Sequence, residues 1–241
     1  VEVSKTIICA GLLDKTITFC KNNNSKFKYS ITCGEIKWAK WISDSCYMLV
    51  DDKRKTFLFR PKAKDCSYFN FIIPEISSIT NKSFYDCIAS DDGKWICMTF
   101  VNSSKKKGAI MLLSTINDIS FEYKGNAATI WKYNNEYYLA IAEKKNNLIK
   151  VFILNLQTLT NTIYDCKIID IQNDNLNDDY PTKISFSEKL ITLFVFTAKG
   201  LILSIETRSF KHYSTICTKG FDDVFVTQDL KLYLSSNDDE I

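Results

Sequence analysis

Short apolar runs, each ended by a polar turn, fill the whole chain. In the segment 94–128, two apolar runs, Trp95–Val101 and Ala109–Ser114, are separated by a lysine-rich loop. A weaker run, Ile119–Tyr123, follows a turn at Asn117–Asp118. Runs of this length, rich in β-branched and aromatic residues and bounded by Asn, Asp, Gly and Lys, are typical of antiparallel strands joined in a meander.

The same pattern predicts about twenty short strands. Gly and Pro are scarce, at seven and three residues, so Asn, Asp, Ser and Lys take the turn positions. No amphipathic helix longer than two turns is predicted. The predicted strands are Thr6–Cys9, Thr16–Cys20, Lys28–Thr32, Ile36–Trp41, Cys46–Val50, Thr56–Phe59, Tyr68–Ile72, Tyr85–Ala89, Lys94–Val101, Ala109–Ser114, Ile119–Tyr123, Ala128–Tyr133, Tyr137–Ala142, Leu148–Leu154, Thr162–Ile169, Lys183–Ser187, Leu190–Thr197, Leu201–Glu206, His212–Cys217, Asp223–Thr227 and Lys231–Leu234.

Strands at this density predict a sandwich, a barrel or a propeller, and a longer period favours the propeller. The segments Ile36–Arg60, Asp86–Thr115 and Lys183–Thr207 each resemble one blade of the WD type, without its Gly-His and Trp-Asp dipeptides. Stacked blades bury both faces of each sheet, which explains why the run Leu190–Phe196 is apolar throughout. We therefore predict an all-β, seven-bladed-type β-propeller. About six blades would lie in a single domain, residues 1–241, as a fragment of a longer chain.

Composition agrees with a packed domain. The chain has 241 residues, of which 46% are hydrophobic, enough for a sizeable core. Its net charge is only +3 and the charges are scattered, which argues against nucleic acid as a partner. No run reaches the roughly 18 apolar residues of a membrane helix. No signal peptide opens the chain, and its first residue is Val1, which indicates a piece of a longer protein.

The nine cysteines are odd in number, irregular in spacing and never form a CxxC pair. Most lie in apolar runs, as Cys97 does in the sequence WICMTF. This pattern indicates buried, reduced thiols in a cytosolic protein. A disulfide framework or a zinc site would need a different spacing. We expect no metal and no cofactor.

Two polar stretches are interpreted as solvated loops. Gln172–Tyr180, before Pro181, lacks the central glycine of a calcium-binding loop. Lys105–Lys107 joins two strands, and its alternative role is contact with membrane phosphates.

Enzyme chemistry has little support in the sequence. His212 is the only histidine, and it lies in a strand-like run, so we read it as structural or exposed. The motifs GxSxG, HExxH and GxxxxGK[ST] do not occur. A propeller enzyme would need carboxylates or arginines converging on the central channel, and no such cluster is recognisable. We predict that the protein is not an enzyme.

Five segments, in collinear order and at nearly constant spacing, resemble the amino-terminal β-propeller domain of clathrin heavy chains. In the first, Lys40, Trp41, Ile42 and Ser43 are identical to the family pattern. The resemblance covers essentially the whole chain. The segments are Ile36–Ser43, the stretch from Lys94 to Ala128 with its Gly125–Ala128 turn, Asp179–Lys189, Thr197–Thr207 and Val224–Thr227.

The resemblance implies a peptide-binding groove between the first two blades. The family's ligands are short extended peptides of the form Leu-apolar-x-apolar-acidic. Such ligands need apolar pockets for alternate side chains and a pair of lysines for the acidic end. The alternative interpretation is an ordinary strand with solvated lysines. The matching positions are Ile7 for an apolar groove residue, Thr16 for the family's threonine, Thr18 in place of Gln, Cys20 in place of Phe, and Lys26 and Lys28 for the lysine pair.

Two further family sites have weaker matches. Val101 matches an apolar residue of a site on top of the propeller that takes Trp-containing peptides. A third site, between later blades, uses an Arg and a Gln, and Asn117 and Phe121 occupy those positions. We expect that third site to be lost or altered.

The resemblance thus implies a clathrin heavy chain terminal domain, a coat scaffold that binds adaptor peptides during coated-vesicle formation, endocytosis and intracellular transport. Its partners would be adaptor proteins with clathrin-box-like peptides and, through regions outside this chain, other heavy chains and light chains. Contact with the membrane would be indirect, through adaptors, at the cytoplasmic face of coated pits and vesicles. The alternative is a structural propeller of another vesicle-coat or nuclear-pore scaffold.

Overall fold

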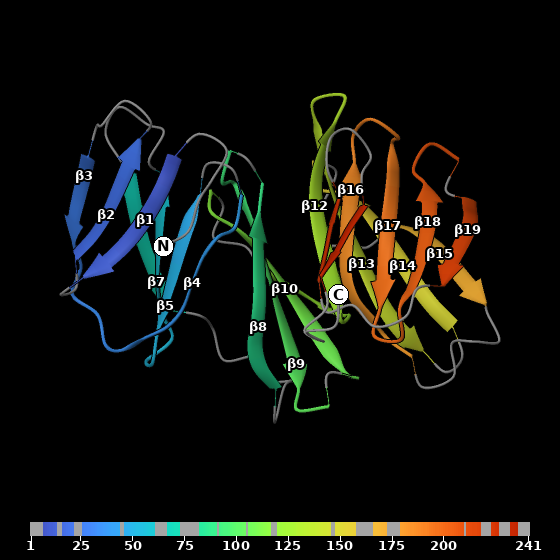
Figure 1. The fold of residues 1–241 in the computed structure, drawn as a ribbon, viewed down its shortest axis with the longest axis horizontal. Helices are drawn as coiled ribbons and strands as arrows, with labels where there is room; N and C mark the ends of the chain where they lie inside the picture. The colour runs from blue at the N-terminus through green and yellow to red at the C-terminus, as the bar shows by residue number, and fades with distance from the viewer. Residues whose placement is uncertain are drawn as a thin grey trace. The chain divides into compact units, whose positions relative to one another are not determined.

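The computed structural model consists of strands and turns (Figure 1). Within the described ranges the chain forms twenty-one β-strands and no helix, so no helix long and apolar enough to cross a membrane is present there. The described residues are 7–13, 16–21, 26–43, 46–60, 67–72, 82–90, 92–104, 106–116, 120–145, 148–157, 166–172, 179–209, 211–217, 223–226 and 232–235.

The strands form six sheets, named A to F in chain order, and each sheet is a meander in which consecutive strands are neighbours. Sheet A contains β1 (Ile7–Leu13), β2 (Thr16–Lys21) and β3 (Lys26–Ser30). Sheet B contains β4 (Ile36–Trp41), β5 (Tyr47–Asp51), β6 (Lys55–Arg60) and β7 (Ser67–Ile72). Sheet C contains β8 (Lys82–Ala89), β9 (Trp95–Asn102), β10 (Gly108–Ser114) and β11 (Ser120–Lys124). Sheet D contains β12 (Ala127–Tyr133), β13 (Glu136–Lys145), β14 (Leu148–Asn155) and β15 (Cys166–Gln172). Sheet E contains β16 (Pro181–Ser187), β17 (Thr192–Thr197), β18 (Leu201–Glu206) and β19 (Lys211–Cys217), and sheet F contains β20 (Asp223–Val226) and β21 (Leu232–Ser235).

The all-β prediction is confirmed, and each predicted strand overlaps one of these strands. Most boundaries differ by one to four residues, and two of these differences have a clear physical reason. β3 ends at Ser30 because Ser30 is the partner of Thr16, where β2 begins. Leu190 and Ile191 belong to the turn before β17, where Ile191 has a φ of 52° that a strand cannot contain. The predicted turn at Asn117–Asp118 lies outside the described residues.

The chain divides into two compact units, which are described separately. Unit 1 comprises Val1–Thr80, Cys87–Ile96 and Ser114–Asp118, and unit 2 comprises Asn81–Asp86, Cys97–Leu113 and Ile119–Ile241.

Unit 1 is built around Phe19, a residue of sheet A that packs against sheet B. Phe19 is fully buried, and its ring lies 5.9 Å from Trp41, 5.7 Å from Tyr47 and 5.6 Å from Phe59, measured between ring centroids. Tilted and edge-to-face aromatic pairs at these distances contribute beyond the area that they bury. The rest of this core cluster is also apolar: Ile17, Ile31, Leu49 and Phe57.

The opposite face of sheet B is covered as well. β5 is buried along its whole length, with Tyr47 and Leu49 in the cluster around Phe19. On the next position of the strand, the sulfur of Met48 lies 3.8 Å from the sulfur of Cys87 in sheet C. Since neighbouring residues of a strand point to opposite faces, β5 is covered on both sides. This confirms the predicted burial of both sheet faces at β5.

Unit 2 has an extensive core cluster between sheets D and E. Sheet E contributes Leu193 and Val195 from β17, and sheet D contributes Val151 and Ala140, among other residues. The Trp131 ring stacks on Phe186 of sheet E, with centroids 5.1 Å apart. On the other face of β17, Phe196 is 1% exposed and clusters with Ile202 and Phe194. β17 is therefore buried on both faces, as its apolar sequence predicts.

Sheets C and D approach each other through glycines. The Gly125 amide donates to the carbonyl of Gly108 at 3.3 Å. A Cβ on Gly125 would lie 2.4 Å from Cγ2 of Ile141, and one on Gly108 would lie 2.1 Å from the carbonyl oxygen of Gly125. Only glycine fits at either position without displacing its neighbour.

Leu49 and Leu190 allow a matched test of core packing. Leu49 is fully buried between sheets, whereas Leu190 is 44% exposed in a turn. We expect Leu49→Ala to lower the free energy of unfolding by about 2–5 kcal/mol, because it removes buried methyl groups and leaves a cavity. The same change at Leu190 should cost less than about 0.5 kcal/mol. Urea denaturation followed by tryptophan fluorescence measures both, and equal effects would contradict the packing described.

Candidate functional site

The predicted groove residues of β2 lie on one face of sheet A. Thr16 and Thr18 are half-buried, and they alternate with Ile17 and Phe19, which are fully buried. Side chains alternate between the two faces of a strand. Since Ile17 and Phe19 pack against sheet B, Thr16 and Thr18 lie on the face of sheet A that is turned away from sheet B.

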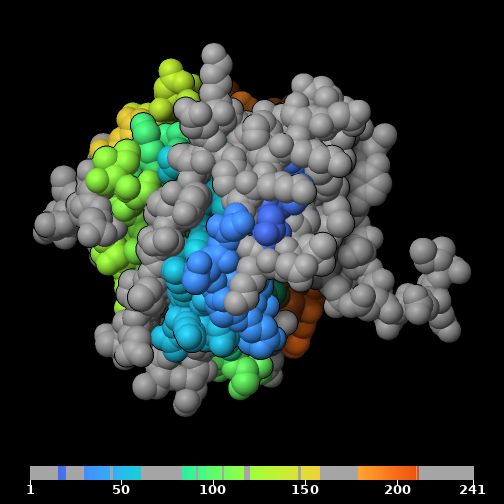
Figure 2. Space-filling model, turned by 90° about the vertical axis from the view of Figure 1, so that its left-hand side faces the viewer, coloured from blue at the N-terminus to red at the C-terminus, as the bar shows by residue number. Residues whose placement is uncertain are grey.

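The register between β2 and β3 pairs the two predicted lysine positions with residues of β2. The Cα partners are Thr16 and Ser30, Thr18 and Lys28, and Cys20 and Lys26. Residues directly opposite each other in an antiparallel pair share a face. Five of the seven predicted peptide-binding residues are therefore brought together by two adjacent strands. The side of unit 1 that includes sheet A is seen in Figure 2, where dark-blue atoms of β2 reach the surface.

The other two predicted residues lie elsewhere. Ile7 begins β1 and is the Cα partner of Lys21, next to an irregularity in the register between Ile7 and Cys9. Val101 lies in β9, in unit 2, and is only 6% exposed. Asn117, predicted for the third site, is outside the described residues, whereas Phe121 lies in β11 and stacks on Tyr123 at 6.5 Å.

The lysine-rich loop has a described part that is exposed. Lys106 and Lys107 are both on the surface, and the Lys107 amide donates to Oδ1 of Asn102 at 3.1 Å. The prediction of a solvated loop is confirmed for these two residues.

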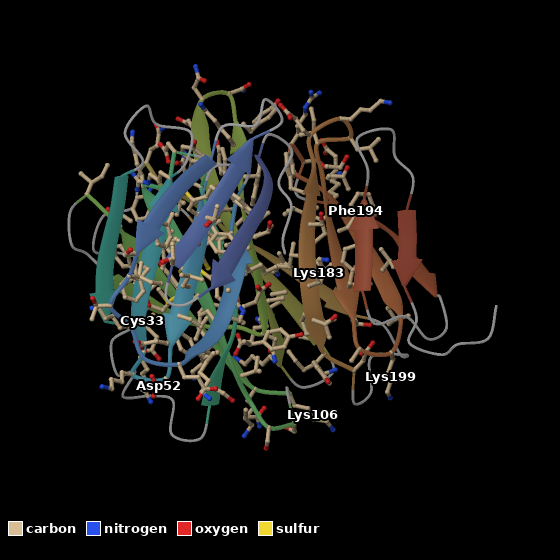
Figure 3. The ribbon with its side chains drawn as sticks, turned by 60° about the vertical axis from the view of Figure 1, so that its left-hand side comes forward. Cys33, Asp52, Lys106, Lys183, Phe194 and Lys199 are labelled. Carbon is tan, nitrogen blue, oxygen red and sulfur yellow. The ribbon has the colours of Figure 1, made fainter. Side chains whose placement is uncertain are left out.

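Two buried carboxylates fasten turns to the strands beside them (Figure 3 labels Asp52 and Lys199 in these turns). Asp51, 3% exposed, accepts hydrogen bonds from the amides of Gly34, Lys53 and Lys55 at 2.8–2.9 Å. It thereby ties the β5–β6 turn to the segment before β4. Three amide donors compensate the cost of burying the carboxylate.

In sheet E the buried carboxylate comes from the chain before the first strand, and it binds the turn after the second strand. Asp179, which precedes β16, accepts hydrogen bonds from the Tyr180 and Lys199 amides at 2.9 Å and from the Thr197 hydroxyl. The prediction that all of Gln172–Tyr180 forms a solvated loop is wrong at Asp179, which is 1% exposed. The carboxylate is buried because the β17–β18 turn supplies donors to it. A polar composition alone does not reveal such a distant partner.

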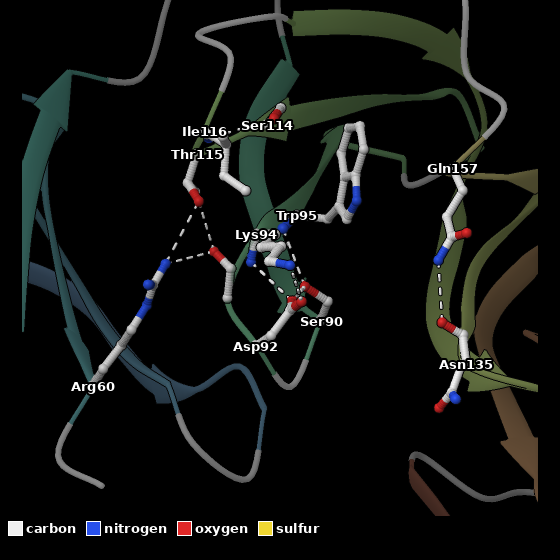
Figure 4. A network of polar contacts seen from close by, with 11 residues as sticks. Arg60, Ser90, Asp92, Lys94, Trp95, Ser114, Thr115, Ile116, Asn135 and Gln157 are labelled. Atoms are coloured by element: carbon white, nitrogen blue, oxygen red, sulfur yellow. Dashed lines mark hydrogen bonds and ion pairs between the residues drawn. The ribbon is translucent and has the colours of Figure 1, made fainter. Parts of the chain in front are cut away.

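Arg60 fastens two turns of unit 1 together (Figure 4). Its Nη2 donates to the Gly93 carbonyl at 2.7 Å and to the Thr115 hydroxyl at 3.5 Å. The Thr115 hydroxyl donates to the same carbonyl at 2.9 Å. Gly93 has a φ of 65°, and a Cβ there would lie 2.6–2.8 Å from the guanidinium group. The glycine thus permits both the turn and the approach of the arginine.

The neighbouring turn is organised by Asp92. Its Oδ1 accepts from the Ser90 hydroxyl at 2.7 Å and from the Lys94 amide at 3.1 Å, and its Oδ2 lies 3.4 Å from the Lys94 ammonium. Burial raises the pKa of this carboxyl, but the hydrogen bonds and the nearby positive charge outweigh burial, so the net pKa is lowered.

Among the described residues, no group of three His, Cys, Asp or Glu side chains lies close enough to hold a metal ion. The thiols of Cys46, Cys87 and Cys97 are buried, as their apolar surroundings in the sequence predict. Burial, with a smaller effect from the charge of Asp86, raises the pKa of Cys97 and leaves its sulfur unreactive.

The comparison with solved structures decides the fold class. The chain matches the β-propeller domain of Cps50 (Swd1) from Myceliophteria thermophila with a probability of 1.00 and a TM-score of 0.51. The sequences are 9% identical, and the match covers 86% of this chain and 68% of the other. The fold is a β-propeller. No family model matches the sequence, and the comparison with curated proteins gives no match.

The propeller explains the repeated connections. In sheets B, D and E, the amides of Asp52, Asn126 and Ala198 each form a 2.8–3.0 Å hydrogen bond that joins the end of the second strand to the residues before the first strand. A second connection occurs in sheets C, D and E, where an amide just after the third strand donates to a carbonyl at the start of the second strand or just before it. The donors are Thr115, Leu156 and Thr207, and the distances are again 2.8–3.0 Å. Each connection is found in three of the sheets.

The contact between Arg60 and Gly93 can be tested with a double-mutant cycle. Gly93→Ala should lower the free energy of unfolding by at least about 1 kcal/mol, through the positive φ and the close approach of Arg60. Arg60→Ala should lower the free energy of unfolding less in the Gly93→Ala background than in the parent. In that background, truncation of Arg60 also removes the clash between its guanidinium group and the new Cβ. Strict additivity of the two changes in urea denaturation would contradict this geometry.

Asp92 should make stability depend on pH. Its folded pKa is below the unfolded value, so its contribution is complete above the unfolded pKa and is lost as the pH falls through the folded pKa. At neutral pH, Asp92→Asn should lower the free energy of unfolding by about 1 kcal/mol. Once the pH has fallen through the folded pKa the two proteins should converge, because the parent carboxyl is then protonated. An unchanged difference in denaturation experiments from neutral to acidic pH would refute this assignment.

Proposed function

We propose that this chain is a non-catalytic scaffold propeller of the clathrin heavy-chain type, which captures short acidic peptides of adaptor proteins. The observation that carries the proposal is the register of β2 and β3. In this register Thr16, Thr18 and Cys20 are the Cα partners of Ser30, Lys28 and Lys26, and Thr16 and Thr18 lie on the face of sheet A not packed against sheet B. Polar and cationic positions thus follow one another along two adjacent strands.

This arrangement suits an extended peptide. Side chains of an extended ligand alternate, so that every second one meets the protein. Two lysine positions on one strand, separated by a single residue, would attract the acidic end of such a ligand. A net charge of +3 for the whole chain does not oppose an anionic ligand.

The resemblance adds support at particular residues. Gly125, in the Gly125–Ala128 turn of the matching segment, has no room for a Cβ beside Ile141. Asp179, which begins another matching segment, fixes the β17–β18 turn. Trp41, in the first segment, lies in the aromatic cluster around Phe19. These residues have structural reasons to occur in a propeller of this type.

In the proposal, sheet A is the second blade, and its face with Thr16 and Thr18 meets a preceding blade across the groove. Each peptide would bind weakly. Many propellers assembled in one coat would raise the effective concentration and give avidity. The protein would act at the cytoplasmic face of coated pits and vesicles, with adaptors between it and the membrane and with heavy and light chains as partners outside this region.

A peptide titration tests the proposal. A fluorescent synthetic peptide of the form Leu-Leu-Asn-Leu-Asp, with a scrambled control, is titrated against the chain by anisotropy. Lys26→Glu and Lys28→Glu should each weaken binding about tenfold or more, because a charge-assisted hydrogen bond contributes about 1.5–3 kcal/mol. Lys189→Glu, on an exposed turn of sheet E, is the matched control and should leave affinity unchanged.

The outcomes separate the two scaffold functions. Absence of binding by the parent chain would refute peptide capture and favour a purely structural propeller of another coat or nuclear-pore scaffold. Equal binding by the parent and both lysine variants would refute the assignment of the lysines.

A further inference from the structure

Two cysteines lie directly opposite each other on neighbouring strands. In the antiparallel pairing of β1 with β2, Cys9 and Cys20 are Cα partners, next to the pair Ala10 and Phe19. Elsewhere, Cys166 is the partner of Leu154 and Cys217 is the partner of Leu201. Cys9 and Cys20 therefore differ from these two strand cysteines, because each has another cysteine as its partner.

The general geometry of an antiparallel pair allows a disulfide at this position. Opposite Cα atoms lie about 4.5–5.5 Å apart, within the range of about 4.4–6.8 Å found for disulfides. Opposite Cβ atoms lie about 4.5–5.5 Å apart, slightly farther than the roughly 3.5–4.5 Å that the bond requires. A bond therefore forms where the two strands close toward the short end of this spacing. A strained disulfide is more readily reduced than an unstrained one, as a reversible link requires.

The position along β1 makes this closure easier. The register shifts between Ile7 and Cys9, so Cys9 occupies the last regular pair before the irregularity. A bulge bends its strand and interrupts the ladder. A small displacement of β1 at this point disturbs fewer backbone hydrogen bonds than one in the middle of the hairpin.

We propose that Cys9 and Cys20 form a reversible, oxidation-dependent disulfide that links β1 to β2. The oxidant is a low-molecular-weight disulfide such as oxidised glutathione. One cysteine thiolate attacks the glutathione disulfide, forms a mixed disulfide and releases one glutathione thiolate. The second cysteine thiolate then attacks the protein sulfur and releases the other. The two protein thiols are oxidised, two glutathione thiols are formed, and the two protons pass to the released glutathione.

The described buried cysteines are poor competitors for this reaction. Cys46, Cys87 and Cys97 are each at most 1% exposed. An attacking sulfur must be accessible and ionised, and burial opposes both. The proposed bond would fix the register of β2, the strand that also carries Thr16 and Thr18, but it does not depend on peptide binding.

Peptide mapping tests the proposal without any variant. Trypsin is expected to cut after Lys5, Lys15 and Lys21, so Cys9 and Cys20 fall in separate peptides, Thr6–Lys15 and Thr16–Lys21, each with one cysteine. The native chain is equilibrated in glutathione buffers with a rising oxidised share, quenched by alkylation and digested without reductant. We expect the two peptides to appear linked in oxidising buffers and to separate again when excess reduced glutathione is added before the quench.

Variants show whether the link is specific. Cys9→Ser and Cys20→Ser should each abolish the linked species, whereas Cys166→Ser, in a strand position opposite a leucine, should leave it unchanged. The proposal is overturned if both cysteines remain fully alkylatable in oxidising buffer. It is equally overturned if they carry only separate glutathione adducts or link to other cysteines.

Discussion

The structure depends on the burial of both faces of a sheet by neighbouring sheets. At β5, Leu49 packs toward sheet A while Met48 contacts Cys87 of sheet C. A single sheet with two apolar faces would expose too much hydrocarbon to remain soluble alone. The free energy that stabilises one blade therefore lies mostly in its contacts with the next. This explains why the hydrophobic cores of both units lie between sheets, around Phe19 in unit 1 and around Val195 in unit 2.

Packing between sheets also buries polar groups at the ends of the strands, and these groups must be hydrogen-bonded. Where a turn packs close to a neighbouring strand, its backbone amides lose contact with water and need another hydrogen-bond acceptor. Asp51 and Asp179 satisfy such amides with buried carboxylates, one from the turn itself and one from the chain before the sheet. Arg60 does the equivalent for the Gly93 carbonyl. The same requirement is met by different residues in different sheets.

The strands and the fold class could be predicted from the sequence because both depend on local features. β-Branched and aromatic runs define the strands, and runs that are apolar on both faces, as in β17, indicate sheets covered on both sides. Register and long-range partners could not be predicted. The end of β3 depends on its pairing with Thr16, and the burial of Asp179 depends on a turn about twenty residues later. Arg60 gives no signal in the sequence, since its acceptors belong to other strands.

The alternation along β2 limits how this region can change. Thr16 and Thr18 occupy one face and Ile17 and Phe19 the other. An insertion or deletion of one residue within the strand would exchange the two sets, exposing Phe19 and burying threonine hydroxyls in an aromatic cluster. Length variation among related sequences should therefore concentrate in the turns, while the strand itself tolerates substitution but not a change of length.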